Sequence, residues 1–216
     1  MFGLPLLGAL LIVLMVVVLL WFAIGTQRNI RKGNDILRWL QPGLRLLGRR
    51  TRLRWLGSSA VQLNIDDAHE PFRQAEVVVV LEPRDLGVLW ARARARGRRD
   101  FLILRGRLAK SPRFELEAGD RRGWTGLERV RRVDRDAWYE ADWDDDDVQV
   151  LHGPAADADV ARDAWNRLAA VSGGVWRLSI RRESPQLEVH VLYPDIASAD
   201  SKAIFESFRD AAKTVM

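Results

Sequence analysis

Hydrophobic and polar positions change character abruptly near the start of the chain. The segment from Phe2 to Ile24 has no charged residue, and the first charge is that of Arg28. As a helix rising about 1.5 Å per residue, this segment is long enough to cross a hydrocarbon core of roughly 30 Å. A signal peptide would begin with positive charge, have a shorter apolar core and end at small residues, whereas this segment ends at Trp21 and Phe22. We therefore expect residues 1–26 to form a retained transmembrane anchor rather than a cleaved leader or a buried helix.

Aromatic and cationic residues at the end of the apolar segment predict its orientation. Trp21 and Phe22 suit the headgroup region, and Arg28, Arg31 and Lys32 follow directly. Because positive charges are retained on the cytoplasmic side, we expect the N-terminus outside and the remaining chain in the cytoplasm of a single-pass cell-membrane protein. The absence of cysteine agrees with that compartment and excludes disulfides, thiolate nucleophiles and cysteine-based metal sites.

The next segment has the hydrophobic spacing of a helix. Apolar residues recur at spacings of seven, three, four and three, at Ile30, Leu37, Leu40, Leu44 and Leu47. This spacing is typical of one helical stripe. Because Gln41-Pro42-Gly43 interrupts the segment, residues 27–50 are predicted to form a broken, basic amphipathic connector. It would lie on the headgroups or against the following domain, and the sequence leaves both alternatives open.

Alternating apolar positions predict a sheet from residue 51 onward. Residues 53–55 and 61–65 alternate with period two and flank Gly57-Ser58-Ser59, which predicts a β-hairpin. The continuous apolar run at 75–81 is typical of a strand covered on both faces. We expect an α+β domain of mainly antiparallel sheet with packed helices.

The order strand, helix, strand, strand occurs twice in the predicted elements. The two Ser-Pro dipeptides that separate the last strands, at Ser111 and Ser184, are 73 residues apart. The predicted strands are 76–83, 100–108, 113–118, 148–154, 175–182 and 186–194, and the predicted helices are 85–96, 127–133, 157–171 and 203–215. This order fits two βαββα repeats, although two unrelated α+β halves fit equally well.

Charge divides the chain more clearly than the strand pattern does. Residues 136–216 contain 16 acidic and 8 basic residues, a net charge of −8. Since the whole chain has a net charge of +5, residues 1–135 have a net charge of +13. We divide the domain accordingly into a basic half, 51–135, and an acidic half, 136–216. A basic face beside an anionic leaflet gains roughly 1 kcal/mol per Lys or Arg. Ordinary solvated faces explain the same distribution equally well.

Arginines cluster at the end of the helix predicted over 85–96. Cations there favour the helix dipole, and such clusters bind phosphate or acidic groups. The chain lacks the aromatic motifs, helix-turn-helix and zinc finger of nucleic-acid-binding modules, and a membrane anchor opposes searching along DNA, so anionic lipid headgroups or an acidic partner are favoured over nucleic acid. The candidate binding residues are Arg28, Arg31, Lys32, Arg92, Arg94, Arg96, Arg98 and Arg99.

An acidic run with two neighbouring tryptophans is the second candidate surface. Divalent cations need several converging oxygens, which consecutive carboxylates cannot supply, and the run lacks the glycine and spacing of an EF-hand. We therefore expect a solvated acidic loop that meets a basic partner or the basic half of this chain, with no metal or other cofactor. The predicted partner interface is Trp138, Trp143, Asp144, Asp145, Asp146 and Asp147.

No catalytic constellation is recognisable in the sequence. His69, His152 and His190 are scattered, and the chain has no GxSxG, HExxH or GxxxxGK[ST] motif. The sequence favours a non-enzymatic, single-pass interaction or accessory protein that presents a cytoplasmic domain at the membrane surface to a protein partner. The alternative is a membrane-surface module that binds anionic lipid through its arginines. An enzyme using Asp142–Asp147 with His152 is the least favoured hypothesis.

Overall fold

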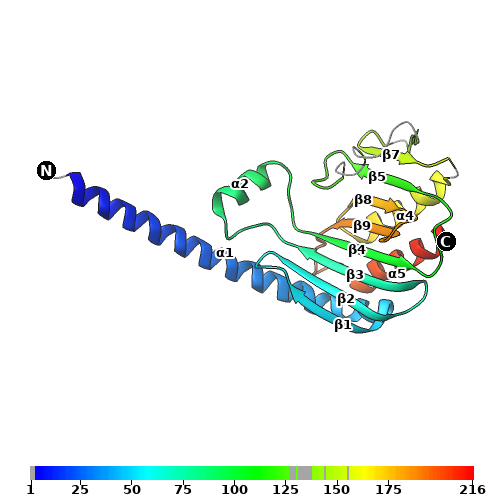
Figure 1. Ribbon diagram of the computed structural model, residues 1–216, viewed down its shortest axis with the longest axis horizontal. Coiled ribbons are helices and arrows are strands. Elements are labelled where there is room, and N and C mark those ends of the chain that lie inside the picture. The colour runs from blue at the N-terminus through cyan, green and yellow to red at the C-terminus, as the bar shows by residue number, and fades with distance from the viewer. Residues whose placement is uncertain (1–2, 127–129, 131–137, 144, 155) are drawn as a thin grey trace.

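The computed structural model describes residues 3–126, 130, 138–143, 145–154 and 156–216 (Figure 1). Its described part contains four helices and a nine-stranded sheet in which every neighbouring pair is antiparallel. The predicted α+β class with a mainly antiparallel sheet is therefore confirmed.

Helix α1, Gly3–Leu47, joins an exposed apolar rod to the folded domain. It is 45 residues long and projects away from the sheet at its N-terminal end (Figure 1). The large apolar side chains from Leu6 to Ile24 are exposed, and in the described chain this helix is long and apolar enough to cross a membrane. The apolar run that the sequence singles out is thus a solvent-exposed helix, as a membrane-spanning segment requires.

The C-terminal half of α1 is part of the domain core. Of the predicted apolar stripe, Leu40, Leu44 and Leu47 are buried and Leu37 packs half-buried against the core, so this part of the stripe is confirmed. Ile30 is half-buried, and Ile36, which the stripe did not include, is buried. The predicted break at residues 41–43 is wrong, because α1 continues through Pro42.

Close packing explains why the proline does not end α1. Gly43 lets α1 approach helix α5, Ser201–Val215, so closely that a Cβ there would lie 2.2 Å from a ring carbon of Phe205. Pro42 itself is exposed, and the carbonyl of Arg38 that it leaves unpaired is in an exposed turn. Burial of the apolar stripe therefore outweighs the roughly 3 kcal/mol that an interior proline costs a helix.

The strands follow the order β1-β2-β3-β4-β9-β8-β5-β7-β6. Their bounds are β1 Gly48–Trp55, β2 Ala60–Ala68, β3 Phe72–Val80, β4 Phe101–Leu108, β5 Leu116–Asp120, β6 Tyr139–Ala141, β7 Val148–His152, β8 Val175–Ile180 and β9 Leu187–Leu192. The predicted hairpin is confirmed as β1–β2, and the predicted strand at 75–81 corresponds to β3, which begins three residues earlier.

The connections do not support a duplicated βαββα unit. In the first segment β3 pairs directly with β4, whereas in the second β5 lies between β7 and β8. Helix α2, Gly87–Ala95, has no buried residue, but α4, Ala158–Val171, packs its buried face on the core. The basic and acidic halves interleave their strands in one sheet. The helix predicted over 127–133 lies outside the described residues, apart from Val130.

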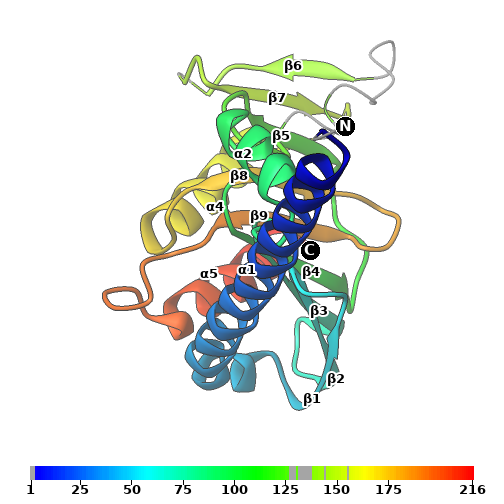
Figure 2. The ribbon, with the colours of Figure 1, turned by 90° about the vertical axis from the view of Figure 1, so that its left-hand side faces the viewer.

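The sheet has one face under helices and one face rich in charge. Helices α4, α5 and the C-terminal half of α1 lie on the same side of it (Figure 2). Because side chains alternate along a strand, Val77, Leu104 and Val189 point into this core. Their neighbours, such as Glu76 and Glu188, point to the opposite face.

Candidate functional site

Helix α2 lies beside α1 at the level where the apolar segment ends. The Trp21 indole Nε1 donates a hydrogen bond to the Arg84 carbonyl at 3.0 Å, and its ring lies 6.5 Å from that of Trp90. Gly25 permits this approach, because a Cβ there would lie 2.2 Å from the Arg84 carbonyl oxygen. Figure 1 shows α2 as the element of the domain nearest the projecting end of α1. Trp21, the tryptophan predicted to lie among headgroups, therefore also forms one of the contacts between α1 and the segment leading into α2.

The apolar residues of α2 face outward instead of into the core. Leu86, directly before α2, and Val88 and Leu89 within it are 47%, 85% and 56% exposed. Together with Val17 and Val18 of α1, the helix lines an apolar groove of about 590 Å³. Contiguous exposed apolar surface is typical of membrane or protein contact, and this surface continues directly into the apolar flank of α1.

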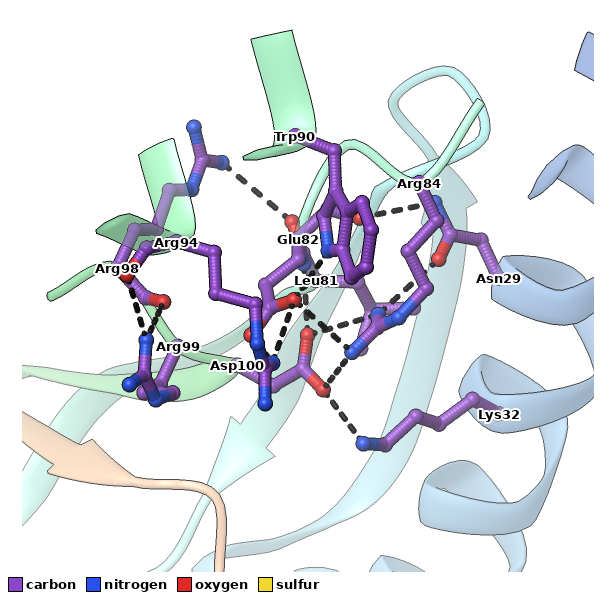
Figure 3. A network of polar contacts seen from close by, with 10 residues as sticks. All are labelled: Asn29, Lys32, Leu81, Glu82, Arg84, Trp90, Arg94, Arg98, Arg99 and Asp100. Atoms are coloured by element: carbon purple, nitrogen blue, oxygen red, sulfur yellow. Dashed lines mark hydrogen bonds and ion pairs between the residues drawn. The ribbon is translucent and has the colours of Figure 1, made fainter. Parts of the chain in front are cut away.

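A buried carboxylate joins α1 to the loop before α2 (Figure 3). Asp100 accepts hydrogen bonds from the Arg84 guanidinium at 2.8 and 3.0 Å and from the Glu82 backbone N–H at 2.6 Å, and its carboxylate is 2.5 Å from the Lys32 ammonium. Burial alone would raise the pKa of Asp100, but these hydrogen bonds outweigh it and lower the pKa. The carboxylate is therefore ionised and holds two cations from different elements.

A second buried group, Glu82, extends the same junction to α2. Its side chain accepts from Trp90 Nε1 at 2.5 Å and from the Arg94 guanidinium at 2.9 Å. Its backbone carbonyl accepts from Asn29 of α1 at 3.0 Å, and Asn29 in turn accepts from Arg84 at 3.2 Å. We call Asn29, Lys32, Glu82, Arg84, Trp90, Arg94 and Asp100 the junction network (Figure 3). It fixes α2 relative to α1 through paired groups, of which Asn29, Glu82 and Asp100 are buried.

Four of the eight predicted cations are engaged within the chain. Lys32 and Arg94 belong to the junction network. Arg98 donates to the Leu81 carbonyl at 3.4 Å and stacks over the Trp124 ring at 5.8 Å. Arg99 donates to backbone carbonyls at the end of α2, which its charge also stabilises through the helix dipole. These four cations chiefly position α2.

The other four predicted cations point to solvent. Arg28 and Arg31 are exposed on α1 just beyond the apolar segment, Arg92 is exposed on α2, and Arg96 is exposed directly after α2. None of the four has an ion-pair partner within the part of the chain that the structure describes. They are the members of the predicted set with charge available to a ligand.

The acidic candidates form an exposed turn before β7. Asp145 Oδ1 accepts from the Asp147 backbone N–H at 3.0 Å, and the Asp147 carboxylate pairs with Arg122 at 2.7 Å. Asp146 is exposed, and Asp144 lies outside the described residues. One carboxylate of the run thus meets the basic half of the same chain, which is one of the alternatives that the sequence leaves open.

The two tryptophans beside the acidic run occupy different environments. Trp143 is 5% exposed and packs edge-on against Trp165, with ring centroids 5.9 Å apart. It is a core residue, so its prediction as part of an exposed interface is corrected. Trp138 is half-buried, and the Arg181 guanidinium lies 4.5 Å from its ring centre. Burial of Trp143 depends on α4, which short-range sequence pattern does not reveal.

A row of charges across the second face of the sheet was not predicted. Arg105 of β4 contacts Glu76 of β3 at 2.9 Å and Glu188 of β9 at 2.6 Å, and Arg177 of β8 contacts Glu188 at 2.7 Å and Glu117 of β5 at 3.2 Å. We call these five residues the polar ladder. The signal in the sequence was a charged residue directly after an apolar residue in each of five strands.

The buried residue His190 contacts the polar ladder at Glu188. Its Nε2 lies 3.1 Å from Glu188, and its Nδ1 lies 2.7 Å from the Thr125 hydroxyl. Burial lowers the pKa of His190 more than the hydrogen bond with Glu188 raises it. Burial raises the pKa of Glu188, but its hydrogen bond with His190 and the charges of Arg177 and Arg105 lower it on balance. The pair is therefore a neutral imidazole donating to an ionised carboxylate.

Comparison with known proteins does not identify a relative. No protein-family model and no curated protein sequence matches the chain.

Within the described ranges, no three His, Cys, Asp or Glu side chains are grouped so that they could hold a metal ion. His152, the base of the least favoured hypothesis, has its Nδ1 2.8 Å from the neighbouring Gly153 carbonyl.

Proposed function

We propose that the chain is a non-enzymatic, single-pass membrane protein that holds an α+β interaction domain in a fixed position on the cytoplasmic leaflet and presents it to a protein partner. The observation that carries the proposal is the continuity of α1 from its exposed apolar end into the domain core. A domain that is only tethered to the membrane would need no more than a flexible linker. A helix shared by the span and the domain instead fixes the position and orientation of the domain relative to the span.

The exposed apolar end of α2 supports direct contact with lipid. Val17, at the level of α2, lies seven residues before Ile24, the end of the apolar segment, which is about 10 Å along a helix. Interfacial helices bury their apolar face about 5–10 Å into the boundary between headgroups and acyl chains. Leu86 and Val88 would therefore reach that boundary, with Arg92 at headgroup level.

Depth-dependent fluorescence quenching tests this seating. The chain has no cysteine, so Val88→Cys can carry a single environment-sensitive fluorophore in the full-length protein in nanodiscs. We expect blue-shifted emission and quenching by nitroxide-labelled lipids. The matched control, Asn166→Cys on the exposed side of α4, should be quenched only by aqueous quenchers. Equal aqueous quenching at both positions would contradict contact of α2 with lipid.

The cytoplasmic orientation is tested by thiol labelling in cells. In the Asn166→Cys variant, a membrane-impermeant maleimide should react only after the cells are permeabilised. Labelling of intact cells would place the domain outside and refute the orientation derived from Arg28, Arg31 and Lys32.

A protein partner is sought by extraction of the full-length protein from its native membrane in mild detergent, followed by mass spectrometry of what co-purifies. A stoichiometric protein supports the proposed function, and recovery with lipid alone favours the lipid-binding alternative.

Binding of anionic lipid is a second candidate function, favoured by the four exposed cations. Arg92 lies in the last turn of α2 and Arg96 directly follows it, and Arg28 and Arg31 lie beyond the end of the apolar segment. Anionic lipid in the nanodisc should raise the melting temperature relative to phosphatidylcholine, and salt should reduce the difference. The double variant Arg92→Gln/Arg96→Gln should lose most of this gain, whereas Arg167→Gln on α4 should keep it. An equal gain in both variants would assign the effect to nonspecific charge.

A further inference from the structure

Strand β1 is an open edge of the sheet. In the described chain its only strand neighbour is β2, and all of its residues from Arg49 to Arg54 are exposed. The Leu56 N–H donates to the Ala60 carbonyl, so these two residues form a hydrogen-bonded pair of the β1–β2 ladder. Their pairing shows which residues of β1 turn their backbone groups toward β2. In an antiparallel ladder alternate residues turn their backbone groups to the same side. The N–H and C=O groups of Thr51 and Leu53 therefore point away from β2 and are free to pair with another strand.

A groove runs beside this edge on the face that the helices cover. It has a volume of about 330 Å³. Leu37, Leu44 and Arg45 of α1 form one wall, and Thr51 and Leu53 of β1 form the other. Because inward side chains of an added strand would point into this groove, apolar residues at alternate positions would contact Leu37 and Leu53 and continue the core layer.

The charge along β1 selects the kind of strand that can pair with it. Arg50 and Arg52 already contact Asp67 and Asp66 of β2, at 3.6 and 2.6 Å. In the described part of the chain Arg45, Arg49 and Arg54 are exposed and have no ion-pair partner. Like charges placed opposite each other repel, so this edge disfavours pairing with β1 of a second copy. Carboxylates would instead be attracted to it.

We propose that the β1 edge binds an extended segment of a protein partner in which acidic and apolar residues alternate, and that this segment adds to the sheet as a further strand. Backbone groups of Thr51 and Leu53 pair with the segment. Its apolar side chains enter the groove, and on the opposite side its carboxylates lie beside Arg54, which has no ion-pair partner in the described chain. This inference extends the proposed function, because it names the surface that the partner uses.

The experiment measures peptide binding to the full-length protein in phosphatidylcholine nanodiscs. The probe is a short fluorescent peptide of alternating glutamate and valine, followed by fluorescence anisotropy. A second peptide of the same composition, with its glutamates and valines grouped in two blocks, is the matched control. We expect the alternating peptide to bind more tightly by about tenfold or more.

Two variants separate strand addition from charge attraction. Thr51→Pro removes one outward N–H donor while leaving the β1–β2 hydrogen bonds, as proline at an edge position allows. It should weaken binding of the alternating peptide by about tenfold with an unchanged melting temperature. Arg54→Glu, which leaves the backbone untouched, should weaken binding as well and make it less salt-dependent.

Equal binding of both peptides, or unaltered binding to Thr51→Pro, would overturn the proposal. A full-length dimer that Thr51→Pro dissociates, without peptide binding, would also overturn it and assign the edge to a second copy. Quenching at Val88 is measured separately, so a domain that does not touch lipid but binds the alternating peptide would refute the seating of α2 and leave this edge as the partner site.

Discussion

Replacing Asp100 by Asn tests whether the junction network couples α1 to α2 and the rest of the domain. The substitution keeps the size of the side chain but removes a charge that is 5% exposed and contacts two cations. Removing one partner of a buried ion pair costs about 3–5 kcal/mol. Lys32 is more than a third exposed, so its share is screened and the Arg84 contact dominates. We therefore expect a loss of about 3 kcal/mol in the free energy of unfolding, at the lower end of that range.

Thermal unfolding of the full-length protein, followed by tryptophan fluorescence in nanodiscs, measures this loss. For a chain of this size each 1 kcal/mol shifts the melting temperature by about 2–4 °C, so Asp100→Asn should melt about 6–12 °C lower. The matched control is Asp210→Asn, whose partner Lys213 lies one turn away on α5 with both side chains half exposed. It should lose no more than about 0.5 kcal/mol. Similar small losses in both variants would refute the stabilising role assigned to Asp100.

The ionisation of Asp100 adds a pH dependence to the same experiment. Its folded pKa lies below the usual value, so the stabilisation is present at neutral pH and is lost as pH falls through the folded pKa. Asp100→Asn should therefore show a smaller loss of stability on acidification than the unaltered protein. An identical acid slope in the two proteins would show that the carboxylate does not remain ionised in the way the network requires.

Three further predictions concern other parts of the fold. Gly43→Val should destabilise by about 1–3 kcal/mol, because its side chain would meet Phe205, whereas Gly8→Val has open space and should unfold like the original in a thermal melt. Arg177→Met should cost about 3 kcal/mol because it leaves buried Glu117 and Glu188 undercompensated, while Arg52→Met at an exposed pair should cost less than about 1 kcal/mol; equal losses would contradict the burial argument. The folded pKa of His190 is lowered, so stability should fall as pH drops below about 6.5, and His190→Gln should flatten this slope in melts recorded between neutral and mildly acidic pH; an unchanged slope would assign it to other groups.

Local pattern was sufficient for much of the fold. The apolar run, the helical stripe that ends at Leu47, and the strands with period-two alternation all depend on neighbours in sequence, and each corresponds to an element of the structure. The expected break at Pro42 was wrong because the deciding term is contact with Phe205, about 160 residues further along the chain. The cost of a proline in a helix can be predicted from the local sequence, but the long-range packing that outweighs this cost cannot.

The candidate site was only partly predictable for a similar reason. The sequence singled out the exposed cations Arg92 and Arg96, since clustering of arginine is visible in the sequence. It did not single out Glu82 or Asp100, which are single carboxylates at the ends of strands. Their significance arises from partners on α1 and α2 that only the folded chain brings together. The polar ladder likewise required the strand order, because its charges come from five separate strands.

Because α1 is one continuous helix, the number of residues between its exposed apolar end and the domain sets how far the domain is rotated about the helix axis. Each residue of a helix turns the chain by about 100° and advances it by about 1.5 Å. One residue added to the apolar segment before Val17 would therefore turn the preceding part of α1 by about 100° relative to α2 and the β1 edge, while the contacts of Trp21, Asn29 and Lys32 with the domain stay in place. Under the proposed function, a membrane neighbour that contacts one side of this apolar segment would meet the domain in one fixed orientation. The number of residues in this part of α1 would then specify which direction in the plane of the membrane the domain faces.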